Sequence, residues 1–370
     1  MSKPMRVAAC HASAVFLSAK GTTEKAISLV HQAAKNNANL VVFPETFIPA
    51  FPVWSSLRPP TENHSLFQKM AQQSIYVDGP EMGAIQAAAK KYSTIVSIGI
   101  SEKVRYSSAC LFNSNVIVGL DGKILVHHRK LMPTFFEKLT WSPGDGYGLR
   151  VAETAFGKIG NLICGENTNP LARYSLMAQG EQLHISTWPA IWPTRAPRTA
   201  VADGVGERNS RSNVSGKEGE KRVPVNYDNI AANRTRAAAH CFEAKCFGVL
   251  CSGRLDQNAI DIISEGSSDE GHVRTVLEQS PAAATMFLDP TGALLPGYTI
   301  NGTSGEKQTK EYLQKEEDIL YADMDFADCV EGKQYHDVVG GYQRLDVFDL
   351  KVNRIRRHPA TFVDTPVLEE

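Results

Sequence analysis

Short runs of hydrophobic residues recur along the chain, separated by stretches with helical spacing or with turn-forming residues. The runs are rich in valine and isoleucine and are bounded by glycine, proline or charged residues, as buried β-strands are. The runs that predict strands are MRVAACHAS (5–13), ANLVVFPE (38–45), STIVSIGIS (93–101), CLFNSNVIVG (110–119), KILVHHRK (123–130), KIGNLICG (158–165), QLHISTWP (182–189), CFGVLCSG (246–253), AATMFLDP (283–290) and ILYADMDF (319–326).

Three stretches between these runs have hydrophobic residues at helical spacing or are rich in alanine. They are GTTEKAISLVHQAAKNNA (21–38), GPEMGAIQAAAKKY (79–92) and NPLARYSLMAQG (169–180). Thr22 or Thr23 is a candidate N-cap of the first helix, and lysines end the second, where they interact favourably with the helix dipole. In the third, Asn169 is a candidate N-cap, Pro170 suits the first helical position and Gly180 suits a stop.

Other runs are separated only by residues that favour tight turns. VIVGLDGKILV (116–126) has Asp-Gly between two apolar runs, which is a strong hairpin signal. AETAFGKIGN (152–161) and FLDPTGALL (287–295) have a similar pattern. Strands that alternate with helices, together with hairpins, indicate an α/β chain with a mixed sheet, or two sheets, covered by helices.

Two stretches interrupt this alternation. Residues 52–80 are polar and contain several prolines before a short helical pattern. Residues 196–226 are rich in glycine, serine and charge with little to bury, so we expect a flexible loop there. Its basic residues alternate with acidic ones, which argues against a nucleic-acid-binding arm. The last forty residues contain a short strand pattern and a basic end.

Composition is that of an ordinary globular protein. The 370 residues are 42% hydrophobic and 21% charged, and 39 basic residues are balanced by 40 acidic ones, for a formal net charge of −1. This balance does not favour binding to nucleic acid or to an anionic membrane. No hydrophobic run approaches the ~20 residues that span a bilayer.

The N-terminus and the cysteines bear on the compartment. Lys3 and Arg6 precede VAACHASAVFLSAK (7–20), which faintly resembles a signal peptide, but His11 interrupts it, and a first buried strand is the simpler interpretation. The seven cysteines are odd in number and widely spread, whereas a disulfide framework is dense and even. We therefore expect a cytoplasmic protein with reduced thiols.

Three chemically distinct side chains lie where predicted strands end. Glu45 ends NLVVFPE, Lys130 ends KILVHHRK and Cys164 ends KIGNLIC. Loops at strand ends converge over a rigid sheet, so we expect these side chains to come together. A thiol, a carboxylate and an ammonium can act as nucleophile, general base and stabiliser of developing negative charge.

Each of these residues also has a simpler explanation. Glu45 could mark a strand end, Lys130 could be a surface lysine, and Cys164 could be a small packing residue. Two features favour a reactive Cys164: a helix start at Asn169 would favour a thiolate, and Gly165 allows a sharp turn or a close approach of substrate. A carboxylate at a buried strand end is also expected to have a raised pKa, which suits a general base.

Several neighbouring residues could line an apolar pocket or simply belong to the core. They are Phe51 and Trp54, which follow Glu45, and Trp188, Ile191 and Trp192 in STWPAIWP (186–193). Glu166 and Asn167 lie beside Cys164, where either could orient the loop.

A second group of potential ligands does not fit a metal site. Cys241, Cys246 and Cys251 are five residues apart, with His240 adjacent, whereas zinc motifs use tighter pairs. A helix that runs into a buried strand explains this spacing. We therefore predict no metal.

Three segments around the candidate residues resemble the motifs of the nitrilase family, which belongs to the carbon–nitrogen hydrolases. They are VVFPETFIPAFP (41–52), HHRKLMPTFFEKLTW (127–141) and CGENTNPLARY (164–174), in the family's order. The resemblance continues in AQGEQLHISTWP (178–189), NYDNIAANRTRAAAHCFEAKCFGVLCSG (226–253) and DVVGGYQRLDVF (337–348), and covers most of residues 5–350. It implies that Cys164 is the nucleophile, Glu45 the general base and Lys130 the catalytic cation. Glu137 matches the family's second glutamate, which supports the site and positions substrate.

The resemblance also implies the architecture and the reaction. The fold would be a four-layer α-β-β-α sandwich, with a single catalytic domain at 1–330 and a C-terminal extension at 331–370 involved in oligomer contacts. The protein would be a homodimer or a larger assembly such as a spiral. It would hydrolyse an organic nitrile to the carboxylic acid and ammonia through cysteine thioimidate and thioester intermediates, with some amide as by-product and without a cofactor.

The chain departs from the family pattern at a few positions. Gly165 stands where the family usually has tryptophan. Some nitrilases that act on aliphatic nitriles share this glycine, which favours aliphatic or arylaliphatic substrates. Gly341 and Leu345 replace a usual histidine and proline in a region that organises the family's assemblies.

Three other functions stay open at this point. An amidase or carbamoylase of the same superfamily would use the same triad on an amide, and a cyanide-converting enzyme would use it on cyanide. A catalytically silent scaffold is the third, although Glu45, Lys130 and Cys164 are all present.

Overall fold

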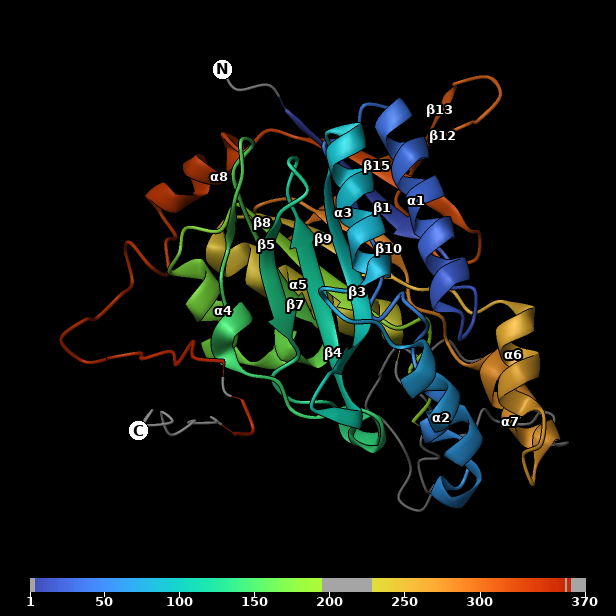
Figure 1. Ribbon diagram of the computed structural model, residues 1–370. Coiled ribbons are helices and arrows are strands. Elements are labelled where there is room, and N and C mark those ends of the chain that lie inside the picture. Colours follow the sequence, from blue (N-terminus) through green and yellow to red (C-terminus); the bar gives the residue numbers. More distant parts are fainter. Residues whose placement is uncertain (1–3, 195–227, 357, 361–370) are drawn as a thin grey trace, which may run out of the picture.

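Two β-sheets form the centre of the protein (Figure 1). The computed structural model describes residues 4–194, 228–356 and 358–360, so the loop predicted at 196–226 lies outside the described residues. The first sheet contains, in spatial order, β13 (Lys307–Lys310), β12 (Gly297–Ile300), β15 (Asp318–Met324), β1 (Met5–His11), β2 (Leu40–Val42), β3 (Ile95–Val104), β4 (Ser107–Val118) and β5 (Ile124–Arg129). The second contains β11 (Leu294–Leu295), β10 (Thr285–Leu288), β9 (Phe247–Ser252), β8 (Leu183–Trp188), β7 (Lys158–Ile163) and β6 (Ala152–Glu153), with β14 (Tyr312–Leu313) paired to β10.

Every run of hydrophobic residues that predicted a strand forms one of these strands. Both sheets are mixed, since β1, β2 and β3 are parallel in the first and β7, β8 and β9 in the second, with antiparallel neighbours beside them. The predicted hairpins are β4–β5, β6–β7 and β10–β11. Their turns hold Gly122, Gly157 and Gly292 at positive φ, a conformation that glycine adopts without steric cost.

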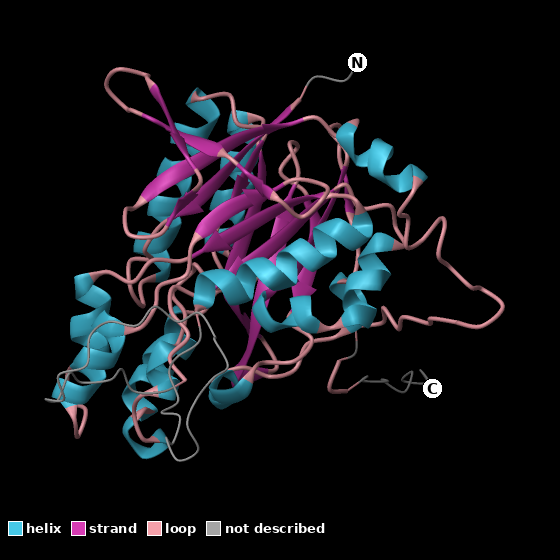
Figure 2. Ribbon diagram, turned by 180° about the vertical axis from the view of Figure 1, so that it is seen from behind, coloured by secondary structure: helices cyan, strands magenta, loops and turns pink. Residues whose placement is uncertain are grey.

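Helices cover the outer faces of both sheets, as the two opposite views show (Figures 1 and 2). They are α1 (Ala19–Lys35) and α3 (Pro80–Tyr92) on the first sheet, and α4 (Pro170–Met177) and α5 (Asn229–Ala244) on the second. Between the sheets, side chains such as Val7 and Leu40 of the first pack with Ile185 and Val249 of the second. The order helix, sheet, sheet, helix confirms the predicted four-layer α-β-β-α sandwich.

Shorter elements lie at the ends of these layers. They are α2 (His64–Gln73), α6 (Gln257–Ser264), α7 (Glu270–Gln279) and α8 (Asp328–Glu331), with the 3₁₀ turns η1 (Val53–Ser56), η2 (Pro60–Glu62), η3 (Phe135–Leu139), η4 (Gly146–Gly148), η5 (Cys164–Thr168) and η6 (Gly332–Gln334). Helices α2, α6 and α7 share a hydrophobic cluster of their own at one end of the sandwich (Figure 1). The turns η3 and η5 matter most for function, because they carry two of the four predicted catalytic residues, Glu137 and Cys164.

The N-cap predicted for the first helix was wrong. Ser18 is the N-cap of α1, and its side chain accepts a hydrogen bond from the backbone N–H of Gly21. The helix therefore begins before Thr22 and Thr23, whose hydroxyl groups donate to the carbonyl oxygens of Val15 and Ala19. The other predicted cap is confirmed, since Asn169 caps α4 with Pro170 at its first position.

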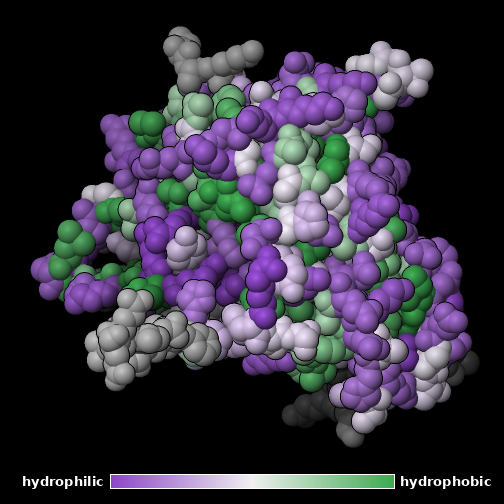
Figure 3. Space-filling view, in the orientation of Figure 1, coloured by the Kyte–Doolittle hydropathy of each residue, from purple (hydrophilic) through white to green (hydrophobic). Residues whose placement is uncertain are grey.

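The strand pattern predicted in the last forty residues does not form a strand in the part that the structure describes, up to residue 360. After η6, this segment runs over the surface and leaves hydrophobic side chains in solvent, which Figure 3 shows on the protruding loop. Leu345 is 79% exposed and Phe348 is 73% exposed. With no neighbouring strand to supply hydrogen bonds, the alternation of residue types alone does not produce a strand.

Two further findings concern membrane-spanning helices and disulfide bonds. No helix in the described ranges is long and apolar enough to cross a membrane. All seven cysteines are free thiols.

Candidate active site

The four predicted catalytic side chains meet between the two sheets. Glu45 follows β2 and Lys130 follows β5 of the first sheet, whereas Cys164 directly follows β7 of the second. Glu137 reaches the same place from η3. The Cys164 sulfur and one carboxylate oxygen each of Glu45 and Glu137 lie within 4.8 Å of one another. Strand ends on both sheets therefore converge here, as predicted.

Lys130 binds both carboxylates. Its Nζ donates to Glu45 Oε1 at 2.8 Å and to the two oxygens of Glu137 at 2.8 and 2.7 Å. None of the three side chains is exposed. Burial alone would lower the pKa of Lys130, but its interactions with Cys164, Glu137 and Glu45 outweigh this and hold that pKa well above its usual value. The ammonium is therefore charged at neutral pH.

The two carboxylate oxygens of Glu45 differ in their hydrogen bonds. Its Oε1 accepts from Lys130 and from Asn113 Nδ2 at 2.7 Å, whereas its buried Oε2 has no partner among the described residues. Burial raises the pKa of Glu45 to about 7, despite the opposing effect of Lys130. This confirms the raised pKa expected for the carboxylate. Near neutral pH, Glu45 can both take and return a proton at Oε2.

Cys164 lies in a strained backbone conformation. Its φ is +50°, which a residue with a side chain adopts only when the surrounding structure holds it. The result is a sharp turn between β7 and α4, and the thiol is 6% exposed.

The prediction that the helix start favours a thiolate was wrong. Burial raises the pKa of Cys164, and Lys130 offsets this only in part. The side chain of Asn169 already accepts from the first N–H groups of α4, those of Leu171 and Ala172, so these are not free to stabilise a thiolate. The Cys164 side chain is therefore a neutral thiol, and it would have to lose its proton in order to act as a nucleophile.

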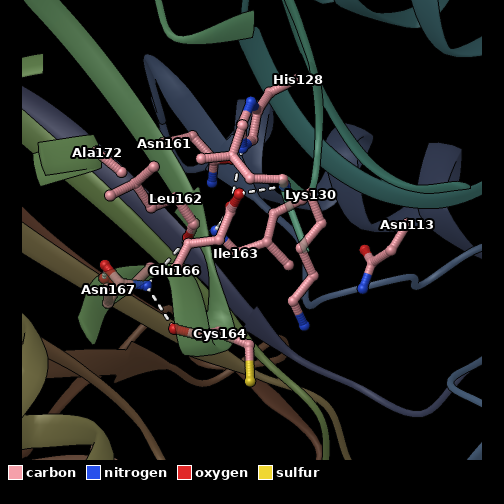
Figure 4. A network of polar contacts seen from close by, with 12 residues as sticks. Asn113, His128, Lys130, Asn161, Leu162, Ile163, Cys164, Glu166, Asn167 and Ala172 are labelled. Atoms are coloured by element: carbon pink, nitrogen blue, oxygen red, sulfur yellow. Dashed lines mark hydrogen bonds and ion pairs between the residues drawn. The ribbon is translucent and has the colours of Figure 1, made fainter. Parts of the chain in front are cut away.

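Two neighbours of Cys164 hold its turn in place. Asn167 Nδ2 donates to the carbonyl oxygens of Cys164 at 3.0 Å and Leu162 at 3.3 Å. The Glu166 carboxylate accepts from the backbone N–H of Ile163 at 2.8 Å and of Leu131 at 2.6 Å. Figure 4 shows both side chains on one side of the turn, away from the Cys164 sulfur. The role considered for them, orienting the loop, agrees with this geometry.

Asn167 is itself held by a buried ionic network. Its Oδ1 accepts from His184 Nε2 at 2.8 Å and from Ser186 Oγ at 3.0 Å. The other ring nitrogen of His184 bonds Glu181 Oε1 at 2.8 Å, and His240 Nε2 bonds Glu181 Oε2 at 2.6 Å. These side chains are fully buried or nearly so.

The hydrogen bonds of this network show which groups face acceptors. The Asn167 amide donates to two carbonyls, so its oxygen faces His184 and can only accept. Interactions with His184 and His240 overcome burial and lower the pKa of Glu181 to about 2, so its oxygens also only accept. Both ring nitrogens of His184 therefore face acceptors, an arrangement that a doubly protonated ring would satisfy. Burial lowers the pKa of His240 to about 4, so that ring is neutral.

Glu181, His240 and Cys246 also lie close enough together to be considered as metal ligands. However, the two imidazole rings already occupy both oxygens of Glu181. Burial raises the pKa of Cys246 well above its usual value, which opposes the thiolate that a metal requires. The described residues of this cluster do not fit a metal site.

Two adjacent pockets open beside the catalytic side chains. The one at the thiol is lined by Cys164, Trp188, Pro189, Trp192, Asn229, Asn233 and Arg236. The larger one has about 500 Å³ of empty volume, and its lining includes Glu45, Phe51, Ile191 and, again, Pro189. Phe51 and Trp192 lie 6.1 Å apart between their ring centroids, so aromatic side chains connect the two spaces. Four of the predicted pocket residues are thus beside the site.

Two predicted pocket residues lie elsewhere. Trp54 is 1% exposed and packs edge-to-face on Phe16 in the cluster around α2, because the 3₁₀ turn η1 directs it away from Cys164. Gly165 lines a separate surface groove with Leu131 and Thr134 instead of the pocket at the thiol. A Cβ on Gly165 would lie 2.8 Å from Thr134 Oγ1, so a side chain there would displace Thr134.

Three site residues escaped prediction from the sequence. Asn113 binds Glu45, His184 holds Asn167, and Arg236 reaches the thiol pocket from α5. A polar residue within an otherwise apolar strand, as in CLFNSNVIVG and QLHISTWP, is the available signal for the first two. Arg236 lies in a helix with other charged residues, and the sequence does not distinguish it from the exposed Arg234.

Comparisons with known proteins agree with this geometry. A family model described as carbon–nitrogen hydrolase matches residues 6–334. The chain is 33% identical to a nitrilase of Penicillium rubens, over 99% of this chain and 98% of that protein. It is 31% identical to an arylacetonitrilase of Hypocrea virens, over 95% of this chain and 92% of that protein.

Solved structures share the fold at lower sequence identity. Nit3 of Saccharomyces cerevisiae, a member of branch 10 of the nitrilase superfamily, matches with a TM-score of 0.62 and 17% identity, over 93% of this chain and 98% of that chain. An amidase from Nesterenkonia matches with a TM-score of 0.57 and 13% identity, over 94% of this chain and 96% of that chain. At these identities the likeness concerns the fold alone.

Proposed function

This chain belongs to the carbon–nitrogen hydrolase family, and we propose that it hydrolyses organic nitriles to carboxylic acids and ammonia. Its relatives over nearly the full length are nitrilases and arylacetonitrilases, which favours a nitrile over the amide of an amidase or carbamoylase. We assign Cys164 as nucleophile, Glu45 as general base, Lys130 as the cation that stabilises negative charge, and Glu137 as the group that positions Lys130.

The first half of the reaction uses the unpaired oxygen of Glu45. As the Cys164 sulfur attacks the nitrile carbon, Glu45 Oε2 takes the thiol proton and delivers it to the nitrile nitrogen, which gives a thioimidate. Lys130 stabilises the negative charge that develops on that nitrogen. Glu137 holds the ammonium with both of its oxygens, so Lys130 keeps its place when Glu45 becomes neutral.

The second half uses water. Glu45 removes a proton from a water molecule as it adds to the thioimidate carbon, and the tetrahedral intermediate expels ammonia to leave a thioester. A second water, activated in the same way, releases the carboxylic acid and restores the thiol. If the tetrahedral intermediate breaks its carbon–sulfur bond instead, the product is an amide.

One observation carries this proposal: a carboxylate oxygen of Glu45 lies within 4.8 Å of the Cys164 sulfur, and the same carboxyl group has a pKa of about 7 and a buried Oε2 with no partner among the described residues. The test measures ammonia and acid released from aliphatic, arylacetic and aromatic nitriles, from cyanide and from the matching amides, with Cys164→Ala as control. Release from an organic nitrile that the variant abolishes supports the proposal. Turnover of amides or cyanide only would contradict it.

The pocket residues and the assembly are part of the same proposal. We assign substrate contacts to Phe51, Ile191, Trp188 and Trp192, whose apolar side chains surround the two pockets. We further propose a single catalytic domain over 1–330 in a cytoplasmic homo-oligomer, with the extension at 331–370 in subunit contacts. The exposed hydrophobic side chains of that extension support such a contact, and the mass of the protein in solution tests it.

A further inference from the structure

The thiol pocket has a polar wall on the side of α5. Asn229, Asn233 and Arg236 line this pocket together with Cys164 and Trp188. These three positions are three or four residues apart, so they share one face of the helix. Asn229 is held in place by a hydrogen bond from its Nδ2 to the carbonyl oxygen of Pro281 at 2.7 Å.

Arg236 is positioned but lacks a counter-charge. Its Nε donates to the carbonyl oxygen of Ala232 at 3.0 Å and its Nη2 to Asn233 Oδ1 at 3.3 Å. Its guanidinium carbon lies 4.7 Å from the ring centroid of Trp188, over the indole. Within the described ranges it has no carboxylate partner, whereas Arg173 of the neighbouring α4 pairs with Glu243 at 3.1 Å. A half-buried guanidinium without a counter-ion is costly unless a ligand supplies one.

A second donor in this pocket also lacks a partner. Trp188 is 1% exposed, and its indole Nε1–H has no acceptor among the described residues. The lining of the pocket thus includes the cation of Arg236 but no acidic side chain.

The charges around the thiol make this cation important for substrate choice. Glu45 and Glu137 together carry more negative charge than Lys130 neutralises, so the catalytic cluster by itself repels an anion. Arg236 is the positive group that lines the pocket with Cys164, and its charge acts on that thiol. An anionic substrate could therefore enter only if its charge is directed to Arg236.

We propose that Arg236 selects nitriles that carry a carboxylate a few bonds from the cyano carbon. This inference rests on the proposed function and names its substrate class. The carboxylate accepts from the free Nη groups of Arg236 while the cyano group points to Cys164. The product then carries two carboxylates, and the newly formed one lies beside Glu45 and Glu137, whose repulsion favours its release.

The test compares two substrates of the same shape. One is the mononitrile of succinate, and the other is its neutral analogue with a methyl ketone in place of the carboxylate. The wild-type protein is expected to favour the anion in kcat/KM. Arg236→Met is expected to lower the ratio of anionic to neutral kcat/KM by about tenfold to a hundredfold, as the loss of a charged hydrogen-bond partner predicts. Arg236→Lys is expected to retain part of the preference.

Arg234→Met is the matched control, because it removes the same charge from an exposed position of the same helix. It should leave the ratio unchanged, and an equal fall in both variants would show that only net charge matters. A wild-type preference for the neutral nitrile, or a ratio that Arg236→Met does not change, would overturn the inference.

Binding to the Cys164→Ala protein separates this inference from the proposed function. Calorimetry with the two nitriles reports recognition without turnover. Tighter binding of the anion that Arg236→Met abolishes would support the carboxylate subsite even if neither nitrile is hydrolysed, a result that would contradict the nitrilase proposal alone. Equal binding of both nitriles would overturn the subsite.

Discussion

Replacing His184 with phenylalanine tests whether a buried ion pair holds the nucleophile turn. Phenylalanine keeps an aromatic ring for the stack on His240, whose centroid lies 3.6 Å away, but it removes both N–H donors. Glu181 then keeps only the N–H of His240, and Asn167 keeps only the hydroxyl of Ser186 as donor to its oxygen. On the hypothesis that His184 is an imidazolium, the change leaves the buried carboxylate of Glu181 without its cation.

The expected cost follows from these lost partners. Breaking a buried ion pair from one side costs about 3–5 kcal/mol, because the remaining charge is not compensated. The bond lost by Asn167 adds about 1 kcal/mol. Since domains are stable by about 5–15 kcal/mol, the variant should fold but unfold at lower urea concentration. Because Asn167 also holds Cys164 at a strained φ, kcat should fall by about tenfold to a hundredfold.

A double variant provides the decisive comparison. Glu181→Gln combined with His184→Phe removes both charges, so it should be more stable than His184→Phe alone by about 2 kcal/mol or more. Urea unfolding of the three proteins at pH 7 measures this difference. A ¹⁵N NMR spectrum of histidine-labelled protein at that pH should show an imidazolium signal that His184→Phe removes. If His184→Phe lowers the free energy of unfolding by less than about 1 kcal/mol, or if the double variant is no more stable than His184→Phe, then His184 is not a cation. Either result would refute the idea that both of its ring nitrogens carry a proton.

Three further changes test other parts of the site. The kcat of the wild-type protein should fall as the pH drops below about 7, where Glu45 becomes protonated. Glu45→Gln should lower kcat by about 10²–10⁴-fold and remove this acidic fall from the pH profile. An acidic fall far from pH 7 in the wild-type protein would contradict the assignment of Glu45 as general base. The pKa of His240 is lowered from 6.5 to about 4 on folding, so the unfolded chain binds a proton that the folded protein excludes. About 3 kcal/mol of the stability present above pH 6.5 should therefore be lost as the pH falls towards 4. His240→Phe should flatten this part of the pH profile measured by urea unfolding, and an unchanged slope would argue against this account. Gly165→Ala should destabilise the fold by about 1–3 kcal/mol through its contact with Thr134. Adding Thr134→Ala should recover part of this stability, and additive losses of the two substitutions would show that the contact is not the cause.

The sequence predicted the layers of the fold well because strands and sheets depend on local pattern. Valine- and isoleucine-rich runs between turn residues have few alternatives, and each one became a strand. The pairing of two strand ends from different sheets is a tertiary property. The meeting of Lys130 with Cys164 could therefore be expected only from the resemblance and from the general rule about strand ends.

The positions of Trp54 and Gly165 differ from those expected because they depend on the direction in which the backbone points each residue. Trp54 follows Glu45 in the sequence, but it lies within the 3₁₀ turn η1 and packs in the hydrophobic cluster around α2. Gly165 follows Cys164, yet the φ of Cys164 is positive and Gly165 lies beside Thr134. Sequence proximity to a catalytic residue does not place a side chain in its pocket, because one unusual dihedral angle reverses the chain.

The direction of the carboxylate pKa separates Glu45, the proposed general base, from the other buried acids. Interactions with histidine and arginine side chains lower the pKa of Glu102, and His128 with two backbone N–H groups lowers that of Glu166, while Glu181 is lowered to about 2. Each of these acids has enough donors to outweigh burial, so its charge is permanent and its role is to hold neighbouring groups. Glu45 shares its single cation with Glu137 and leaves one oxygen unpaired, and burial therefore raises its pKa to about 7. In the proposed reaction, a supporting acid needs a full set of donors, whereas a base needs one donor fewer, because the unpaired oxygen is the one that would take protons from a thiol and from water.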